Sequence, residues 1–136
     1  MTQLRFAIGL LMTVACSGLY AQTIAVRADI PFDFRVGDTA MPAGQYQLNY
    51  SSGVLIVRSA DRHHRAAAFL TIPTIRSGAP AKGELVFNRY GAAYFLANVW
   101  SSDSTTGRAL RRSAVEKEFA ASASSISSVA VALRRN

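Results

Sequence analysis

Apolar residues occupy every even-numbered position from Ile24 to Val36, seven in succession. The side chains of a β-strand point alternately to its two faces, so this run places all its apolar side chains on one face. The odd positions carry mostly charged residues. Pro31 is among them and marks a bulge, a bend between sheets or an edge, because proline has no N–H to donate. We therefore expect a strand with one buried face, interrupted near Pro31.

Further strand patterns follow along the chain, separated by turn residues rich in Gly, Ser and Asp. Pro73 limits its strand to an edge, a bulge or a strand end. Gly91 separates two strands that predict a hairpin. The expected strands span residues 45–50, 54–59, 66–75, 84–90, 92–100 and about 129–133.

The pattern changes period after residue 112. Ser113 and Glu116 form a capping box, in which a serine and a glutamate three residues later satisfy free N–H groups at a helix start. We expect a short helix over residues 114–121, with Val115 and Phe119 on the face that packs onto the sheet. The fold class is mainly β: a small antiparallel β-sandwich or barrel of about seven strands with one short C-terminal helix.

The N-terminus has the layout of a secretory signal. Arg5 precedes an uncharged apolar run, residues 6–15, which is too short to span a membrane, and Ala21 provides a cleavage site. We expect residues 1–21 to be a signal peptide and residues 22–136 to be a single β domain in the periplasm or outside the cell. The alternative is a lipid anchor on Cys16, because residues 13–16 loosely resemble a lipobox.

Cleavage after Ala21 removes 21 of the 136 residues and leaves 115, enough for one domain with its own core. It also removes the one cysteine, so disulfides and thiolate metal sites are excluded from such a mature chain. Loss of Arg5 lowers the formal charge from +7 to +6. The excess of positive charge favours an anionic envelope polymer or another envelope protein as the partner. We expect contact with a membrane only if Cys16 is lipidated. We do not expect nucleic acid, because no recognition motif is present.

Motifs for catalysis or metal binding are weak. The two histidines, His63 and His64, are adjacent on one polar turn with Asp61, a poor start for a metal site. Asp29 and Asp33 could form a carboxylate pair for acid–base catalysis. Charges that keep a strand face soluble are the better interpretation. No nucleophile elbow, P-loop or dinucleotide fingerprint occurs. We expect no enzyme activity, cofactor or metal.

Two groups of residues are candidates for binding. Arg108, Arg111 and Arg112 could bind an anion at one end of the fold, since guanidinium groups fork onto phosphate or carboxylate. Hydrated arginines flanking the helix are the alternative. The second group comprises the aromatic residues Tyr46, Tyr94 and Trp100, which fit either core packing or contact with a sugar or lipid.

Several pieces of the chain resemble a group of small secreted bacterial proteins, frequent in acidobacteria, that have no assigned activity. Residues 28–46 contain A-D-I-P-F-D-F-R-V-G and P-A-G-Q-Y, and residues 85–112 contain L-V-F-N-R-Y-G, Y-F-L-A-N-V-W and T-G-R-A-L-R-R. The resemblance covers most of the mature chain and implies export and a β domain. It carries no catalytic or binding residues. Where we expect histidine in the F-x-R-Y-G piece, this chain has Asn88.

Three functions follow as hypotheses. The first is an exported, noncatalytic envelope or extracellular protein with a structural, adhesive or binding role, acting through strand edges or the arginine-rich end. The second is a β-barrel that binds a small lipid or sugar in an apolar mouth near Tyr46, Tyr94 and Trp100. The third is a hydrolase or metal enzyme, which requires the His63-His64 turn to meet acidic or serine partners.

Overall fold

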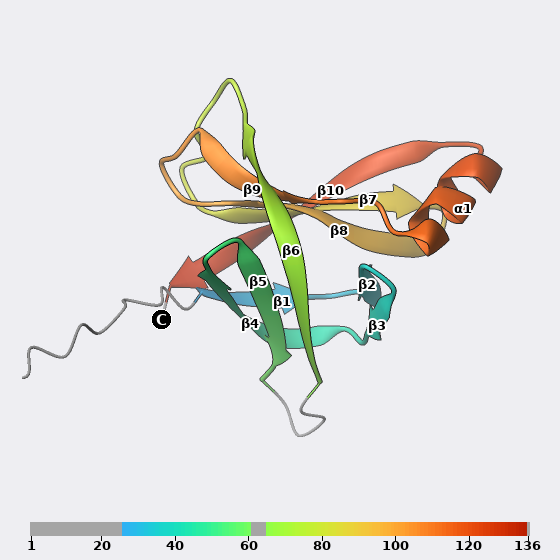
Figure 1. Cartoon of the computed structure of the whole chain (residues 1–136), viewed down its shortest axis with the longest axis horizontal. Coiled ribbons are helices and arrows are strands. Elements are labelled where there is room, and N and C mark those ends of the chain that lie inside the picture. Colours follow the sequence, from blue (N-terminus) through green and yellow to red (C-terminus); the bar gives the residue numbers. More distant parts are fainter. Residues whose placement is uncertain (1–25, 61–64, 136) are drawn as a thin grey trace, which may run out of the picture.

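The computed structural model describes residues 26–60 and 65–135. The predicted signal peptide, Cys16 and the His63-His64 turn lie outside the described residues. Within these ranges the chain forms ten strands and one helix (Figure 1). The strands are β1 (Val26–Ile30), β2 (Phe34–Val36), β3 (Thr39–Met41), β4 (Gly44–Ser51), β5 (Val54–Ser59), β6 (Ala66–Ile75), β7 (Glu84–Tyr90), β8 (Ala93–Trp100), β9 (Thr106–Leu110) and β10 (Ile126–Arg135), and the helix is α1 (Ala114–Ser122).

Eight of the strands close into an antiparallel barrel. Their order is β8-β7-β10-β1-β4-β5-β6-β9, and β9 pairs back onto β8. The ten-residue strands β6 and β10 make the closure possible, because each pairs with a different neighbour along its two halves. In Figure 1, β6 crosses in front from one layer of strands to the other. The expected mainly β fold with a short C-terminal helix is confirmed, and its form is a barrel.

The first predicted strand is divided at Pro31. β1 ends before the proline, and β2 leaves the barrel wall to pair with β3 and, in parallel, with β8 at Arg35 and Phe95. The Asp33 carboxylate accepts a hydrogen bond of 2.9 Å from the backbone N–H of Ala43, which holds the β2–β3 hairpin in place. Of the three roles that the sequence left open for Pro31, the structure has the bend, between β1 and β2.

Two strands were not expected from the sequence. β3 is only three residues long and lies between the first two expected strands. β9 begins at Thr106 and Gly107, after the expected strand 92–100 and before the expected helix. Gly107 has low strand propensity, and β9 forms because β6 and β8 both pair with it.

The core fills the barrel with the inward side chains of alternating residues. The buried residues of β1, β4 and β5 follow the alternation and come in pairs two residues apart: Ala28 and Ile30, Tyr46 and Leu48, and Leu55 and Val57. Aromatic rings fill one end: Phe34 packs edge-on against Tyr46 and Phe87 at centroid distances of 5.0 and 5.5 Å. The β2–β3 hairpin covers this same end, where Gly37 contacts the Phe69 ring. The barrel is therefore closed at the end next to the hairpin.

Helix α1 packs on the outside of the barrel against β7 and β8. Ser113 is its N-cap, and its hydroxyl accepts a hydrogen bond of 3.1 Å from the Glu116 N–H, which is one of the two bonds of the predicted capping box. The Glu116 carboxylate accepts from Tyr90 and Asn88 instead. Phe119 contacts Phe95 of β8 at 5.5 Å between ring centroids. Within the described ranges, no helix has the length and apolar character needed to cross a membrane.

Candidate functional site

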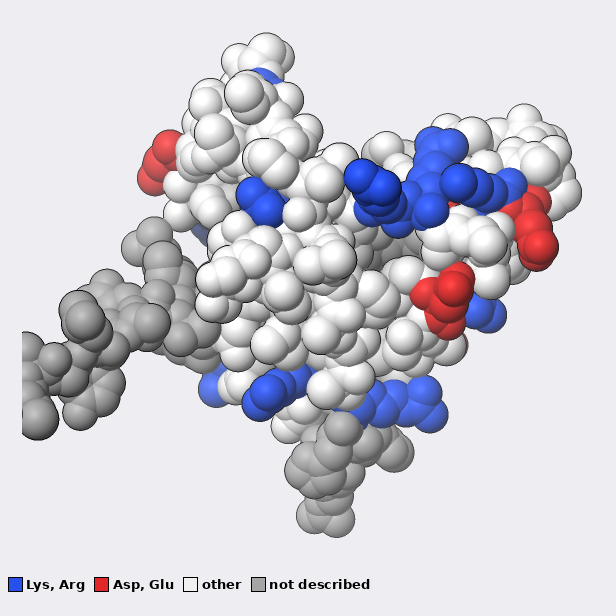
Figure 2. All heavy atoms as spheres, viewed as in Figure 1, with Lys and Arg blue, Asp and Glu red and all other residues white. Residues whose placement is uncertain are grey.

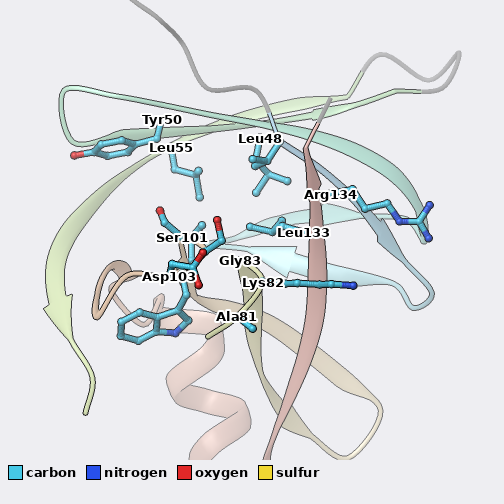
Figure 3. A pocket seen from close by; sticks show the side chains of 14 residues that line it. Leu48, Tyr50, Leu55, Ala81, Lys82, Gly83, Ser101, Asp103, Leu133 and Arg134 are labelled. Atoms are coloured by element: carbon cyan, nitrogen blue, oxygen red, sulfur yellow. The ribbon is translucent and has the colours of Figure 1, made fainter. Parts of the chain in front are cut away.

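A cavity of about 720 Å³ lies at the barrel end opposite the β2–β3 hairpin. Leu48, Leu55, Val99 and Leu133 form its apolar wall, and they come from β4, β5, β8 and β10. In Figure 3, the labelled leucines point into the space between the β4–β5 turn and the loops that follow β8 and precede β7. The volume falls within the range of roughly 300–1,000 Å³ that is typical of small-molecule sites.

The apolar wall is a consequence of the same alternation that builds the core. Leu48 and Leu55 are inward residues of their strands and are only 1% and 2% exposed, so they belong to the packed core that bounds the cavity. Val26, Val99 and Leu133 are half-buried and offer more of their surface to it. Leu133 is the last inward apolar residue of β10, and its backbone N–H donates to the Gly83 carbonyl at 2.8 Å. This main-chain hydrogen bond holds the part of the wall that contains Leu133 against the loop before β7.

Polar groups stand at the rim. Ser101 and Asp103 belong to the loop between β8 and β9 and lie across the cavity from Tyr50 and Leu55 (Figure 3). Asp103 has a positive φ of 55°, and its N–H donates to the Pro80 carbonyl at 2.8 Å, which ties its loop to the β6–β7 connection. The rim is thus made by two loops that are hydrogen-bonded to each other.

Two cations also line the cavity, but their charged ends extend away from it. Figure 3 shows the side chains of Lys82 and Arg134 directed outward, on the far side from Leu55. Arg134 lies 3.4 Å from a carboxylate oxygen of Asp29 on the neighbouring strand β1. Both side chains of this pair are well exposed, so its contribution to stability is small.

The three predicted ligand-contacting aromatics separate in the structure. Trp100 lines the cavity, and its ring lies on Gly107, where a Cβ atom would come within 2.5 Å of the indole. Tyr46 is 1% exposed in the core and donates its hydroxyl proton to the Pro42 carbonyl. Tyr94 stacks on Phe32 at 3.9 Å between centroids and lines a second hollow, of about 510 Å³, beside the β2–β3 hairpin. The structure therefore brings one of the three to the larger cavity.

The predicted arginine cluster is divided too. Arg108 lies on β9, where its Nε donates to the Thr71 hydroxyl at 2.9 Å and its Nη2 donates to the Thr71 carbonyl at 3.0 Å. Its guanidinium also lies 4.9 Å from the centre of the Tyr50 ring. Arg111 and Arg112 are exposed between β9 and α1, and Figure 2 shows Lys and Arg side chains gathered beside the helix. Arg108 thus braces the barrel, whereas the other two face solvent.

A buried carboxylate lies under α1, away from the cavity. Glu116 is 4% exposed and accepts hydrogen bonds from the Tyr90 hydroxyl at 3.1 Å and from the Asn88 amide at 3.0 Å. Burial raises the pKa of the Tyr90 hydroxyl above its usual value, the Glu116 carboxylate adds to the rise, and Arg112 opposes it. These contacts fasten the helix to β7.

The two aspartates that we considered have different partners. Asp29 forms an ion pair with Arg134, and Asp33 accepts the hydrogen bond from Ala43 beside the β2–β3 hairpin. Across residues 26–60 and 65–135, no group of three or more His, Cys, Asp or Glu side chains is arranged to hold a metal ion. His63 and His64 lie outside these ranges.

Sequence reasoning did not identify the residues that line the cavity, apart from Trp100. Leu48 and Leu133 were visible as members of alternating strands, and the same signal marks core residues at the closed end. Asp103 belongs to a segment in which the sequence shows no binding motif. The β2–β3 hairpin closes one end of the barrel, so its position decides which end stays open. No local sequence pattern predicts that position.

Comparison of the chain with models of protein families, with curated proteins and with solved structures gave no match.

Proposed function

We propose that this chain is an exported, noncatalytic protein whose barrel binds a small apolar ligand. The observation that carries the proposal is the cavity of about 720 Å³ at the open end, walled by aliphatic side chains of four strands. A concave apolar site with a few polar groups at its rim is the usual form of a small-molecule site. Export is supported by the signal-type N-terminus.

The chemistry of the lining favours binding over catalysis. Among the described lining residues, Asp103 is the one carboxylate, and no histidine or cysteine accompanies it. General acid–base or nucleophilic catalysis needs a positioned proton donor or nucleophile with a partner. The apolar wall, in contrast, offers a favourable environment for a hydrocarbon chain or ring.

Trp100 provides a direct test, because it is the single tryptophan of the chain and it lines the cavity. We expect the fluorescence of Trp100 in the mature protein to change saturably when a neutral apolar probe such as N-phenyl-1-naphthylamine is titrated in. Replacement Leu133→Phe narrows the cavity and should weaken binding about tenfold, equivalent to about 1.4 kcal/mol. The matched control is Leu70→Phe, since Leu70 is 80% exposed on the outside of β6. The proposal fails if the probe does not bind, or if both variants weaken binding equally.

A second candidate function is attachment to another envelope protein. Leu70 and Ile72 of β6 lie two residues apart, so their side chains share one face of the strand, and they are 80% and 45% exposed. Large apolar residues grouped on an outer sheet face are typical of interaction surfaces. Arg111 and Arg112 offer a separate exposed site for an anionic polymer.

Cosedimentation with isolated cell envelopes tests this second candidate. The double replacement Leu70→Ser and Ile72→Ser should lower the bound fraction if the outer face of β6 is the attachment face. Ile126→Ser is the control, because Ile126 is 54% exposed on a different strand, β10. Equal binding of all three proteins would contradict attachment through β6.

A further inference from the structure

The polar groups that face the cavity accept hydrogen bonds. Figure 3 shows Ser101 and Asp103 on the side of the opening across from Tyr50 and Leu55. Asp103 is exposed, and no described residue forms a hydrogen bond or ion pair with its carboxylate. Its oxygens are therefore available to a donor group on a ligand.

The same rim disfavours a ligand with a negative charge. A carboxylate head group at the opening would lie near the Asp103 carboxylate, and like charges repel. The cations that could offset this repulsion, Lys82 and Arg134, extend away from the cavity, and Arg134 is beside Asp29. A cationic head group is attracted by Asp103 but repelled by the formal charge of the whole chain, +7, and for an anionic head group both effects are reversed. Neither sign of charge is therefore favoured by the rim and the whole chain together.

We propose that the ligand of this cavity is a neutral single-chain amphiphile with a hydroxyl head group. Its hydrocarbon chain lies among Leu48, Leu55 and Leu133, and its hydroxyl donates to the Asp103 carboxylate, with Ser101 as a second partner. This inference rests on the proposed function and adds the head-group chemistry of the ligand to it.

Two compounds with the same chain separate the head groups: 1-monolauroylglycerol, which is neutral and carries hydroxyls, and laurate, which is anionic. Each displaces N-phenyl-1-naphthylamine from the mature protein in a competition assay below the critical micelle concentration of both compounds. We expect monolauroylglycerol to bind about tenfold more tightly than laurate. In Asp103→Asn, laurate should gain affinity and the preference should fall towards equality.

Asn is the suitable replacement because Asp103 has a φ of 55°, a conformation that Asn tolerates. The control is Asp38→Asn, which removes the same charge from the turn between β2 and β3 at the closed end of the barrel. We expect this control to keep the wild-type preference. If Asp103→Asn does not fold, the relative affinity of the wild-type protein for monolauroylglycerol and laurate tests the inference without the variant.

The outcomes separate the two proposals. Equal or tighter binding of laurate by the wild-type protein overturns the head-group inference and leaves the binding function standing. An unchanged preference in folded Asp103→Asn also overturns the inference. Failure of the naphthylamine probe to bind the wild-type protein overturns the binding function itself.

Discussion

The Tyr90 hydroxyl donates its proton to a carboxylate that is almost fully buried, and the two groups constrain each other. Burial and the nearby Glu116 charge both disfavour ionised Tyr90, so its pKa is raised from the usual 10.0. A group whose pKa is higher in the folded than in the unfolded state stabilises the fold below the unfolded value. That contribution is lost as the pH rises through the folded value.

Replacement Tyr90→Phe should lower the free energy of unfolding by about 1–3 kcal/mol near pH 7, because the buried Glu116 carboxylate loses a donor. Above about pH 10 the difference between wild type and variant should shrink, since only the wild type loses the tyrosine contribution. Urea denaturation at several pH values measures both effects. A difference that stays constant through alkaline pH would contradict this assignment.

Two glycines of positive φ test the closed end of the barrel. Gly37 has a φ of 59° and a Cβ there would lie 2.6 Å from Phe69, whereas Gly91 has a φ of 62° with open space around it. Gly91→Ala should therefore lower the free energy of unfolding by about 1 kcal/mol through backbone strain. Gly37→Ala should lower it by about 1–3 kcal/mol more, because the Phe69 ring must move. Equal effects of the two replacements in denaturant unfolding would show that the hairpin does not pack on Phe69.

At the scale of elements, helix α1 depends on its N-terminal cap. Ser113→Ala removes the acceptor for the Glu116 N–H and should lower the free energy of unfolding by about 1 kcal/mol. Ser124→Ala is the control, since Ser124 is exposed and lies beyond the helix. Thermal unfolding, monitored by circular dichroism, measures the stability of both variants. An equal loss in both variants would mean that the cap does not hold α1.

Elements with strong periodicity could be predicted from the sequence, and weakly patterned ones could not. The alternation of β1 and β4 and the capping box of α1 are local signals, and the structure has these elements within a few residues of the predicted bounds. β9 has a glycine and two polar residues in five, so its own preference for a strand is low. It forms because β6 and β8 present unpaired edges on its two sides, which is tertiary information.

At the scale of the whole molecule, the barrel has two different ends. The β2–β3 hairpin and the rings of Phe34, Tyr46 and Phe87 fill one end, whereas the described loops between β6 and β7 and between β8 and β9 form the rim of the cavity at the other. The sequence identifies a buried face for each strand without indicating which buried residues touch a neighbour and which face a cavity. Tyr46 and Leu48 illustrate this: they share one face of β4, yet only Leu48 reaches the cavity.

Methyl chemical-shift mapping tests the central claim, a ligand bound inside the open end of the barrel. We expect monolauroylglycerol, added below its critical micelle concentration, to shift the methyl resonances of Leu48, Leu55 and Leu133 in the mature protein. The exposed methyls of Leu70 and Ile72 should stay unchanged, because they lie on the outer face of β6. Shifts confined to those outer methyls, or the absence of any shift, would contradict the account.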